Sequence, residues 1–570
     1  MAAQGPAHSP APRAEIRALW VDAFHAGIRS AAEAEQLVAD AKRAGANTLI
    51  VQVRRRGDAL YLKSVEPPVE EPNYDPSFDA LANIIEVAHR AGIEVHAWVN
   101  AMPVWRDQAP PRDARHVFNR HGDAAQGDAR WLTESPKGET KFLVGYFLDP
   151  GHPDAAAYLT EIYLNIVRNY AVDGIHFDYI RYPETAERLP RGAPVGYNAR
   201  NLARFRAAHG KPADYMPDPG DQAFIEWRRK QVTQLVRRVY IEAKAIRPEI
   251  KISAALIPWG KPPTNEKDFE TVAPMQRIFQ DWHGWMKEGI LDLAVPMNYA
   301  REHDPVVRGW FDGWIAWEKK HKHGRQLAVG IGAYVNTEAN TLAQIERVRQ
   351  KQGRYSADGV SFFSYANMFP ATSPAQAPQQ QTAAAAPAGT NAPAAAPAQA
   401  AAPATATPAA PAAQQTAAAT APATTPASNP ADAAVRAGAA FPVAAPVAGG
   451  APAPAARDRV AFLAVGAGER KGAFAVPSPV PPMDWIVAPK TGFAAGIAKN
   501  ADGAPDDGVT IVLKRGFFSR ARRIEADGNG WFGFTNVKPG KYKVWSERAG
   551  KKSAPQRIEV TAGKVARVAL

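Results

Sequence analysis

The stretch NYAVDGIHFDYIRYPE, residues 169–184, decides the fold of this chain. It joins the end of an amphipathic helical pattern to a short apolar run typical of a strand that is buried on both faces. The run nevertheless carries Asp173, His176 and Asp178, with tyrosine and arginine around its end. Buried acids are costly unless they are solvated, paired or functional, so this strand points to a site.

Seven more runs of this type lie between residues 15 and 370, with helical patterns between them. Several of those patterns end in Gly or Pro just before the next run, as helices do. Alternating strands and helices predict a parallel sheet, and eight strands predict a (β/α)8 barrel. A doubly wound sheet is the alternative, but no G-x-G-x-x-G follows the first strand. The expected strands are residues 16–24, 47–54, 93–101, 172–181, 251–258, 292–299, 327–334 and 359–368.

Side chains along a strand alternate between its two faces, so His176 and Asp178 share one face and Ile175 and Phe177 share the other. The apolar pair is expected to pack on the helices. This places His176 and Asp178 in the barrel lumen, with Asp178 nearer the rim, where barrel enzymes carry their chemistry. Asp173 is expected in a turn at the opposite end. Asp178 is expected to be functional, with a structural ion pair as the alternative, and His176 is expected either to orient a partner or to be a satisfied core histidine.

Other expected strands also end in aromatic, amide and acidic residues. Sugars are bound by such sets, because rings stack on their apolar faces and polar groups bind their hydroxyls. A single aromatic residue of this kind is more often part of a core, so their coincidence at strand ends carries the prediction. Trp20, His25, Gln52, Asp304, Tyr334, Asn336 and Asn367 lie at these ends, and the expected substrate-binding residues are Asp22, Arg54, Asp58, His96, Trp98, Asn100, His176, Tyr179, Arg181, Trp259, Asn298, Tyr299 and Tyr365.

Four blocks of the barrel region together resemble the glycosyl-hydrolase-like family 10 domain of bacteria. They are NTLIVQVRRRGDALYLKSVEPP (47–68), YDPSFDALANIIEVAHRAGIEVHAWVNAM (74–102), FLDPGHPDAAAYLTEIYLNIVRNYAVDGIHFDYIRYPE (147–184) and LDLAVPMNYA (291–300). The resemblance implies a (β/α)8 fold and hydrolysis of a glycan, and members include exported enzymes that cleave peptidoglycan strands lacking stem peptides. The D-G-I-H-F-D block also resembles the fourth strand of other retaining barrel glycosidases, which implies that Asp178 carries catalysis.

Glycoside cleavage usually needs two carboxyl groups, and Asp178 is the expected nucleophile or base. The proton donor stays open, because chitinase-type strands continue Asp-x-Glu whereas this chain has Ile180 at that position. A substrate N-acetyl carbonyl is an alternative nucleophile, with Asp178 then orienting or stabilising it. The candidate proton donors are Glu302 and Glu184, followed by Asp22 and Asp58.

Residues 371–479 are dominated by Ala, Pro, Thr and Gln and predict an extended linker between two domains, 15–370 and 480–570. In the second domain, alternating strands with Asp-Gly, Asn-Gly and Pro-Gly turns predict a small β-sandwich. DGNGWFGFTNVKPGKYKV, residues 527–544, resembles the carboxypeptidase-regulatory-like sandwiches. That resemblance implies a role in stability or attachment, with Phe532 and Phe534 facing inward.

Composition removes several classes of function. The formal net charge of +12 favours anionic partners, but the basic residues are scattered and no nucleic-acid-binding motif occurs, so nucleic acid is not expected as a partner. The absence of cysteine excludes disulfides and thiol catalysis. A lone His96, without a His-x-His pattern, disfavours a metal-dependent deacetylase, and no cofactor or metal is expected. No run reaches the roughly 18 apolar residues of a membrane helix.

The sequence therefore predicts a glycoside hydrolase acting on a polysaccharide, with peptidoglycan strands as one candidate substrate. The alternative is a non-catalytic carbohydrate-binding or scaffold protein built on a barrel. The first residues lack the pattern of a signal peptide, while the linker and second domain fit an exported enzyme. A periplasmic, cell-surface or secreted location is expected.

Overall fold

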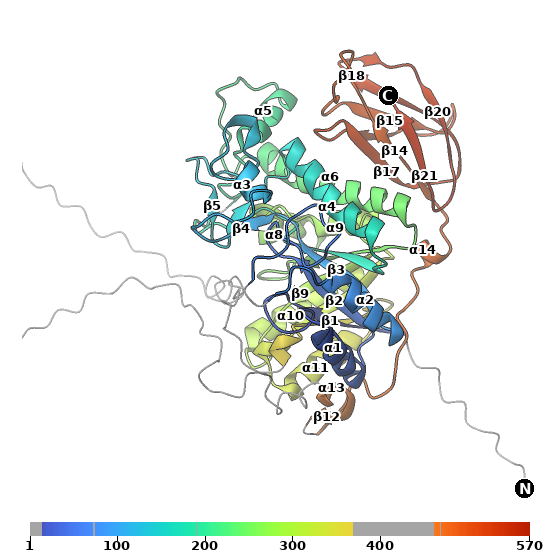
Figure 1. The fold of residues 1–570 in the computed structure, drawn as a ribbon. Coiled ribbons are helices and arrows are strands. Elements are labelled where there is room, and N and C mark those ends of the chain that lie inside the picture. The colour runs from blue at the N-terminus through green and yellow to red at the C-terminus, as the bar shows by residue number, and fades with distance from the viewer. Residues whose placement is uncertain (1–13, 72–73, 190, 369–460, 468) are drawn as a thin grey trace, which may run out of the picture.

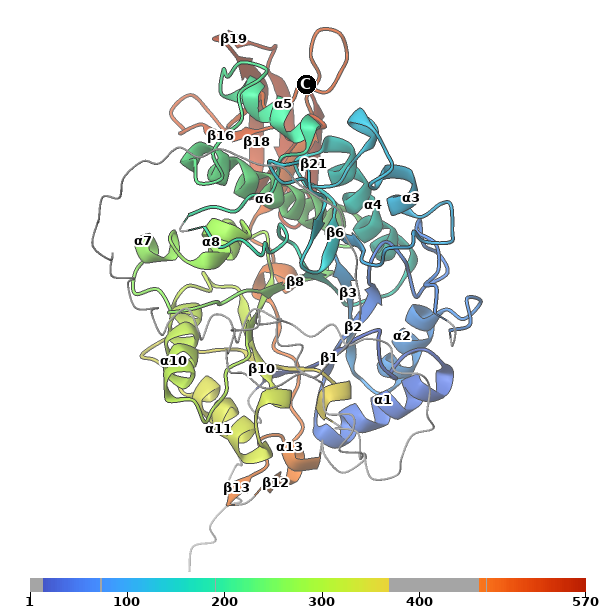
Figure 2. The same ribbon diagram turned by 90° about the vertical axis from the view of Figure 1, so that its left-hand side faces the viewer.

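Eight parallel strands form a closed barrel in the computed structural model, which describes residues 14–71, 74–189, 191–368, 461–467 and 469–570. Figure 2 shows the strands as a ring with helices outside it. The (β/α)8 barrel predicted from the sequence is confirmed, and each expected run overlaps one barrel strand. In chain order they are β1 (Ile16–Val21), β2 (Thr48–Arg54), β3 (Glu94–Asn100), β7 (Gly174–Asp178), β8 (Lys251–Leu256), β9 (Leu293–Asn298), β10 (Gln326–Gly332) and β11 (Gly359–Phe363).

The outer helices begin and end at the residues that helix chemistry favours. Ser30 accepts a hydrogen bond from Glu33 N at the start of α1, and Gly45 ends that helix in the left-handed conformation, with φ of 71°. Asp79 caps α2 in the same way by accepting from Ala82 N. The helices around the barrel are α1 (Ala31–Ala44), α2 (Ala80–Arg90), α4 (Pro153–Asn169), α6 (Gln222–Ile246), α9 (Trp282–Glu288), α10 (Pro305–Lys320) and α11 (Glu338–Arg349).

The longest connections follow barrel strands and therefore lie at the carboxyl end of the barrel. One separates β3 from α4, and another separates β7 from α6. Figure 1 shows the first as a group on the left of the molecule. This elaborated end is where barrel proteins place their sites. The connecting elements are α3 (Val117–His121), β4 (Pro103–Trp105), β5 (Lys141–Phe142), β6 (Gly145–Phe147), α5 (Ala199–Ala208), α7 (Glu266–Phe269) and α8 (Ala273–Arg277).

The two faces of β7 divide as the alternation predicts. The Phe177 ring packs on Tyr163 of α4, with ring centroids 4.6 Å apart. His176 faces the lumen, where its Nε2 accepts a hydrogen bond from Trp20 Nε1 of β1 at 3.1 Å. Asp173 lies at the amino-terminal end, where its Oδ2 accepts from Val95 N at 2.8 Å. The strand thus presents Asp178 at the opposite, carboxyl end.

Residues 476–487, the bottom segment, close the amino-terminal end of the barrel. Met483 packs in the lumen cluster that contains Trp20, and Trp485 joins that cluster from its edge. Trp485 Nε1 also donates to Asp292 Oδ1 at 2.6 Å, and Glu15 N donates to Pro479 O at 3.0 Å. Chain far from the barrel in sequence therefore supplies part of its core. The segment contains α14 (Asp484–Val487).

The linker expected over residues 371–479 falls largely outside the described residues. Its end is described, and contacts the barrel: α13 (Ala461–Val465) lies against α1, and β12 (Gly466–Ala467), which pairs with β13 (Arg470–Lys471), lies against α11. The low-complexity composition did not indicate this packing. The anchoring residues Phe462, Leu463 and Phe474 are buried in the same apolar cluster as the outer helices.

The carboxyl-terminal region forms two β-sheets that share an apolar core. Its strands are ordered β17-β14-β21 in one sheet and β16-β15-β18-β19 in the other, with β20 paired to β18. Phe532, Phe534 and Val544 are buried in one cluster of this region, so both phenylalanines face inward as expected. The strands are β14 (Gly492–Ile497), β15 (Thr510–Lys514), β16 (Arg522–Glu525), β17 (Trp531–Val537), β18 (Gly540–Arg548), β19 (Lys551–Lys552), β20 (Gln556–Val560) and β21 (Val565–Ala569).

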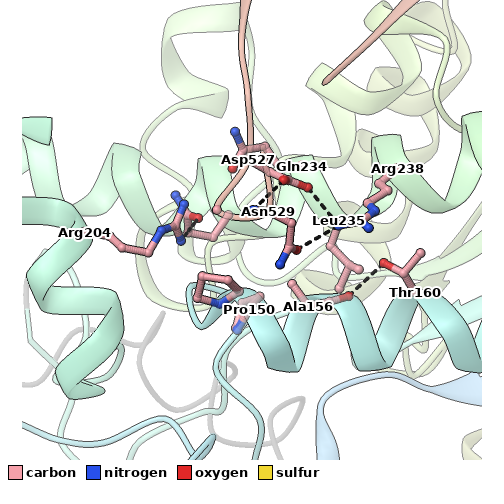
Figure 3. A pocket seen from close by; sticks show the side chains of 12 residues that line it. Pro150, Ala156, Thr160, Arg204, Gln234, Leu235, Arg238, Asp527 and Asn529 are labelled. Carbon is pink, nitrogen blue, oxygen red and sulfur yellow. Dashed lines mark hydrogen bonds and ion pairs between the residues drawn. The ribbon is translucent and has the colours of Figure 1, made fainter. Parts of the chain in front are cut away.

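These sheets dock directly on the barrel helices. Arg204 Nε of α5 contacts Asp507 Oδ2 at 2.7 Å, and Trp531 Nε1 donates to Glu242 Oε1 of α6 at 2.7 Å. Figure 3 shows Arg238 of α6 beside Asp527 and Asn529, and its Nη1 donates to Asn529 Oδ1 at 2.8 Å. The contact therefore combines charged and polar pairs with apolar packing, because Ala495 and Trp531 are buried in the same cluster as the barrel helices and Phe493 packs on Tyr240. Among the described residues, no helix is long and apolar enough to span a membrane.

Candidate active site

Asp178 ends β7 at the carboxyl rim of the barrel, and only 7% of its surface is exposed. Tyr179 N donates to its Oδ1 at 2.6 Å, and Arg181 Nη1 lies 3.8 Å from the same oxygen. The indole N–H of Trp98, which donates to Asn100 Oδ1 at 2.9 Å, also acts to favour the ionised carboxylate. Burial raises the pKa of Asp178, while the Arg181 charge and the N–H groups of Tyr179 and Trp98 oppose that rise. The carboxyl is thus desolvated but supplied with partners for its ionised form.

Tyr179 takes the left-handed backbone conformation, with φ of 49°. A non-glycine residue in this region is strained by about 1–3 kcal/mol, and such residues cluster at functional sites. The turn brings Arg181 back to the carboxylate that it follows, with its guanidinium carbon 4.3 Å from the centre of the Tyr179 ring. Burial raises the pKa of Tyr179 to about 12, so its phenol is neutral at physiological pH.

Glu184 approaches the other side of the same guanidinium. Its Oε1 lies 3.9 Å from Arg181 Nη2, and Arg181 itself is 2% exposed. Burial raises the pKa of Glu184, although Arg181 and Arg188 act to lower it. Because both contacts are to one guanidinium, they keep the Asp178 and Glu184 oxygens within about 10 Å, a limit that includes the separations of retaining and inverting glycosidases.

Glu302, the other preferred proton donor, is held by α11 instead. Arg347 Nη1 contacts its Oε1 at 2.6 Å, Arg347 Nη2 contacts its Oε2, and Gln344 Nε2 donates to Oε2 at 3.2 Å. Its own backbone N–H donates to Asn336 Oδ1 at 2.8 Å. Glu302 thus fastens the loop after β9 to an outer helix, with both carboxylate oxygens occupied.

The two remaining acids are held in their ionised forms. Burial acts to raise the pKa of Asp22, but the hydrogen bond and charge of His25, whose Nδ1 lies 2.7 Å from Asp22 Oδ1, bring it below its usual value. Burial likewise opposes ionisation of Asp58, yet the Arg55 charge, at 2.9 Å, lowers its pKa to about 2. Neither residue is suited to donate a proton, which leaves Glu184 among the four predicted donors.

The two lumen histidines lie deeper than Asp178. His176 Nδ1 is 2.9 Å from Ser253 Oγ while its Nε2 accepts from Trp20, and burial holds its pKa well below the usual value. His96 Nδ1 lies 3.5 Å from the same Ser253 oxygen, and its Nε2 lies 3.6 Å from Glu94 Oε2. Of the two interpretations of His176, these contacts support the satisfied core histidine. These contacts are to Trp20, Ser253 and Glu94 and not to a group at the rim, so both histidines belong to the lumen core.

Three expected binding residues face the helices and not the lumen. Arg54 Nε donates to Glu66 Oε2 at 2.7 Å, Asn298 Nδ2 donates to Glu318 Oε2 of α10 at 2.9 Å, and Tyr365 Oη donates to Asp40 Oδ2 of α1 at 2.8 Å. Asn298 follows Met297 of the lumen cluster, so strand alternation turns it outward, whereas Tyr365 lies beyond the end of β11. At Arg54 the register also shifts, between Gln52 and Arg54. These three support the barrel wall, which corrects their expected role.

Aromatic rings gather at the carboxyl end of the lumen. Tyr299 lies 5.4 Å from Phe363 and 6.0 Å from Tyr334, measured between ring centroids, and Phe363 lies 6.4 Å from Trp98. Phe363 was not among the expected binding residues, although the two-residue alternation along β11 would have turned its ring toward the lumen. These rings supply the apolar surfaces that a sugar needs.

Two other expected residues also lie at this end. Asn100, beside Asp178 in the β3–β7 register, accepts from Trp98 Nε1 at 2.9 Å and donates to Arg55 O at 3.2 Å. Trp259 is partly exposed in the loop after β8. Within the described ranges, no group of three or more acidic or histidine side chains is arranged to hold a metal ion.

A closed parallel barrel with buried carboxyls and aromatic rings at its carboxyl rim is the architecture of the barrel glycosidases. Comparison with known families agrees at that level. The chain belongs to the family described as Glycosyl hydrolase-like 10, whose model matches residues 15–344. The match covers every barrel strand except β11, and it ends before the bottom segment.

Two curated relatives carry related names. The chain is 25% identical to Glycosyl hydrolase DigH of Escherichia coli (strain K12) over 287 residues, which cover 48% of this chain and 60% of that protein. It is 25% identical to Glycosyl hydrolase YngK of Bacillus subtilis (strain 168) over 350 residues, covering 56% and 61%. The chain thus spans about three-fifths of the length of these relatives.

Among solved structures, the glycoside hydrolase domain of PgaB (BpsB) from Bordetella bronchiseptica is similar with a TM-score of 0.45 and 16% identity. The superposition covers 63% of this chain and 95% of that one.

Proposed function

We propose that the protein is a glycoside hydrolase in which Asp178 acts as the ionised nucleophile or base and Glu184 donates the proton. The observation that carries the proposal is that the buried Arg181 guanidinium lies 3.8 Å from the buried Asp178 carboxyl and 3.9 Å from the partly buried Glu184 carboxyl. Family membership supports a carbohydrate-active role for this end of the barrel.

The division of roles follows from the different surroundings of the two acids. Asp178 receives the Tyr179 N–H, and the nearby Trp98 indole N–H, which donates to Asn100, also acts to lower its pKa, so both favour its carboxylate form. No hydrogen-bond donor reaches Glu184 among the described residues, and burial raises its pKa. A raised pKa favours the protonated form that a general acid requires, and a stabilised carboxylate suits attack or activation of water.

The substrate proposed is a bacterial polysaccharide, with peptidoglycan glycan strands as the first candidate. The rings of Trp98, Tyr299 and Phe363 would stack on sugar faces, and Asn100 would bind a hydroxyl group. The carboxyl-terminal sheets are proposed to form a carboxypeptidase-regulatory-like sandwich that supports the barrel. A location outside the cytoplasm is proposed with them, since a polymer of the envelope would be met there.

The test is a panel of denuded peptidoglycan, chitin and α-glucan, with reducing ends measured and products identified by mass spectrometry. We expect the unaltered protein to release fragments from one of these and Asp178→Asn to bind that glycan but release none. Asp173→Asn, at the opposite end of β7, is the matched control and keeps activity. If the unaltered protein binds a glycan without releasing reducing ends, and Asp178→Asn binds equally, the protein is a binding module and the enzyme proposal fails.

A further inference from the structure

The hairpin between β15 and β16 presents two phenylalanines to solvent. Phe517 is 86% exposed and Phe518 is 98% exposed, more than any other large apolar side chain in the described part of the chain. Their rings meet edge to face with centroids 5.2 Å apart. Exposed rings of this size normally mark a contact with another surface, since leaving them in water forgoes the favourable free energy of burial.

The residues around these rings are basic. KRGFFSRARR, residues 514–523, contains five Lys or Arg residues and no acid. Arg515 and Arg520 are exposed and form no ion pair with any described residue, and Lys514 Nζ lies 5.7 Å from the centre of the Phe517 ring. The tip of the hairpin, residues 514–523, therefore exposes two aromatic rings beside basic side chains, of which Arg515 and Arg520 have no ion-pair partner among the described residues.

The tip is held in shape by its own contacts. Ser519 N donates to Gly516 O at 3.2 Å, and Gly516 N donates to Ser519 Oγ at 3.0 Å, which closes the turn that carries both phenylalanines. Arg522 Nη1 donates back to Thr535 O of β17 at 2.8 Å. The two rings are thus displayed on a braced turn, and a partner would not have to order it.

We propose that this tip docks the protein on an anionic lipid bilayer, with Phe517 and Phe518 entering the interface and Lys514, Arg515 and Arg520 contacting lipid phosphates. Aromatic rings prefer the membrane interface, and basic side chains beside them gain from the negative potential of anionic lipids. A sugar platform would use a ring face flanked by acids or amides. The tip has an edge-to-face ring pair and only Ser519 as a neutral polar side chain, so lipid is favoured over glycan.

The position of the tip also suits this partner. Arg522 contacts Asn536 O at 3.4 Å, and Asn536 Nδ2 donates to Glu288 O at 2.8 Å. Glu288 ends α9 immediately before β9 begins, so the tip lies toward the amino-terminal end of the barrel. Asp178 lies at the other end. In Figure 1 the carboxyl-terminal sheets and α14 share one side of the molecule, and β4 and β5 lie on the opposite side. Docking through the tip would leave the carboxyl rim open.

The test is sedimentation of the full chain with vesicles of phosphatidylcholine that contain phosphatidylglycerol, beside vesicles of phosphatidylcholine alone. We expect binding to the anionic vesicles at low salt and much weaker binding to the neutral ones. Phe517→Ser with Phe518→Ser should weaken binding at least about tenfold, and Arg515→Glu with Arg520→Glu should weaken it and flatten its salt dependence. Val306→Ser, which removes a valine that is 57% exposed on the barrel, is the matched control and should bind like the unaltered protein.

The proposal is overturned if the unaltered protein does not bind anionic vesicles, or if the double phenylalanine variant binds them equally well. It is also overturned if that variant loses binding to a lipid-free insoluble glycan while it still binds the vesicles. The last would make the tip a glycan-binding surface. Hydrolysis of soluble glycan by the tip variants is expected to match that of the unaltered protein, so the outcome is independent of the proposed catalytic roles.

Discussion

Asp178 and Glu184 face opposite nitrogens of one buried guanidinium, with Arg181 Nη1 3.8 Å from the first and Nη2 3.9 Å from the second. Two acids that share a cation are coupled, because any change at Arg181 alters both. Neither distance is a hydrogen bond, so the arginine acts on the carboxyls through its charge and leaves their oxygens available to substrate.

Arg181→Met is expected to shift the pH–rate profile toward alkaline pH. Arg181 lowers the pKa of both acids, so its removal raises both values. Asp178 must be ionised to act, so the acid limb of the profile shifts to higher pH. Glu184 must be protonated, so the alkaline limb shifts to higher pH as well. Measuring kcat/KM against pH checks this, and an unmoved profile with reduced activity would mean that Arg181 only supports the fold.

Glu184→Gln should distinguish a proton donor from a structural acid. Loss of a general acid costs about 10²–10⁴-fold on a natural glycoside, whose leaving alcohol needs a proton. An aryl glycoside with a 4-nitrophenolate leaving group needs little help, so activity on it should fall far less. Equal losses on both substrates would show that Glu184 is not the donor.

Glu302→Gln is expected to reduce stability and leave activity nearly unchanged. The carboxylate is bound by Arg347 and Gln344 in a mostly buried site, and weakening this contact should lower the free energy of unfolding by about 2 kcal/mol. Urea denaturation and kcat/KM at a temperature below the transition measure the two effects. A large loss of kcat in folded protein would return Glu302 to the list of catalytic candidates.

Trp485→Ala should destabilise the barrel, although residue 485 lies outside residues 15–344, which match the family model. The change removes the bond to Asp292, the packing on the lumen cluster and the contact with Arg325, whose guanidinium carbon lies 4.7 Å from the ring centre. We expect a loss of about 2–4 kcal/mol in the free energy of unfolding. Val487→Ala, two residues away and 73% exposed, should stay within about 0.5 kcal/mol of the unaltered protein. Equal stability of the two variants would contradict the sealing role of the bottom segment.

Because of Glu318, the free energy of unfolding is expected to fall as the pH rises. Burial raises its pKa from 4.5 to about 8, so between these values the folded state holds a proton that the unfolded state has lost. The stabilisation that Glu318 contributes is fully present below its pKa in the unfolded state, and it is lost as the pH rises through its pKa in the folded state. Chemical denaturation at a series of pH values should show a negative slope across this window that Glu318→Gln reduces. The same slope in the variant would assign the effect to other groups.

Much of the barrel could be predicted because its signals are local. Each strand and helix carries its own periodicity, and the two-residue alternation placed His176 and Asp178 inward correctly. The other binding residues were chosen by their position at strand ends alone, and that choice failed for Asn298 and Tyr365, whose side chains contact α10 and α1. Arg54 follows a shift of register that no residue count reveals.

The roles of the acids depend on contacts between distant parts of the chain. Glu302 is paired with Arg347, 45 residues further on, and composition alone gives no sign of that partner. The bottom segment is rich in proline and follows a low-complexity region, so its packing in the barrel could not be read from a pattern. By contrast, Arg181 and Glu184 stand close to Asp178 in sequence, and what the structure adds is the turn at Tyr179 that gathers them.

The chain packs on the barrel both before and after residues 369–460. Met368 is 5% exposed on the barrel, and α13 begins again at Ala461 against α1. Residues 14–368 and 461–570 therefore belong to one body. The two parts could be produced as separate polypeptides that reassemble into one particle through the bottom segment and the docked sheets.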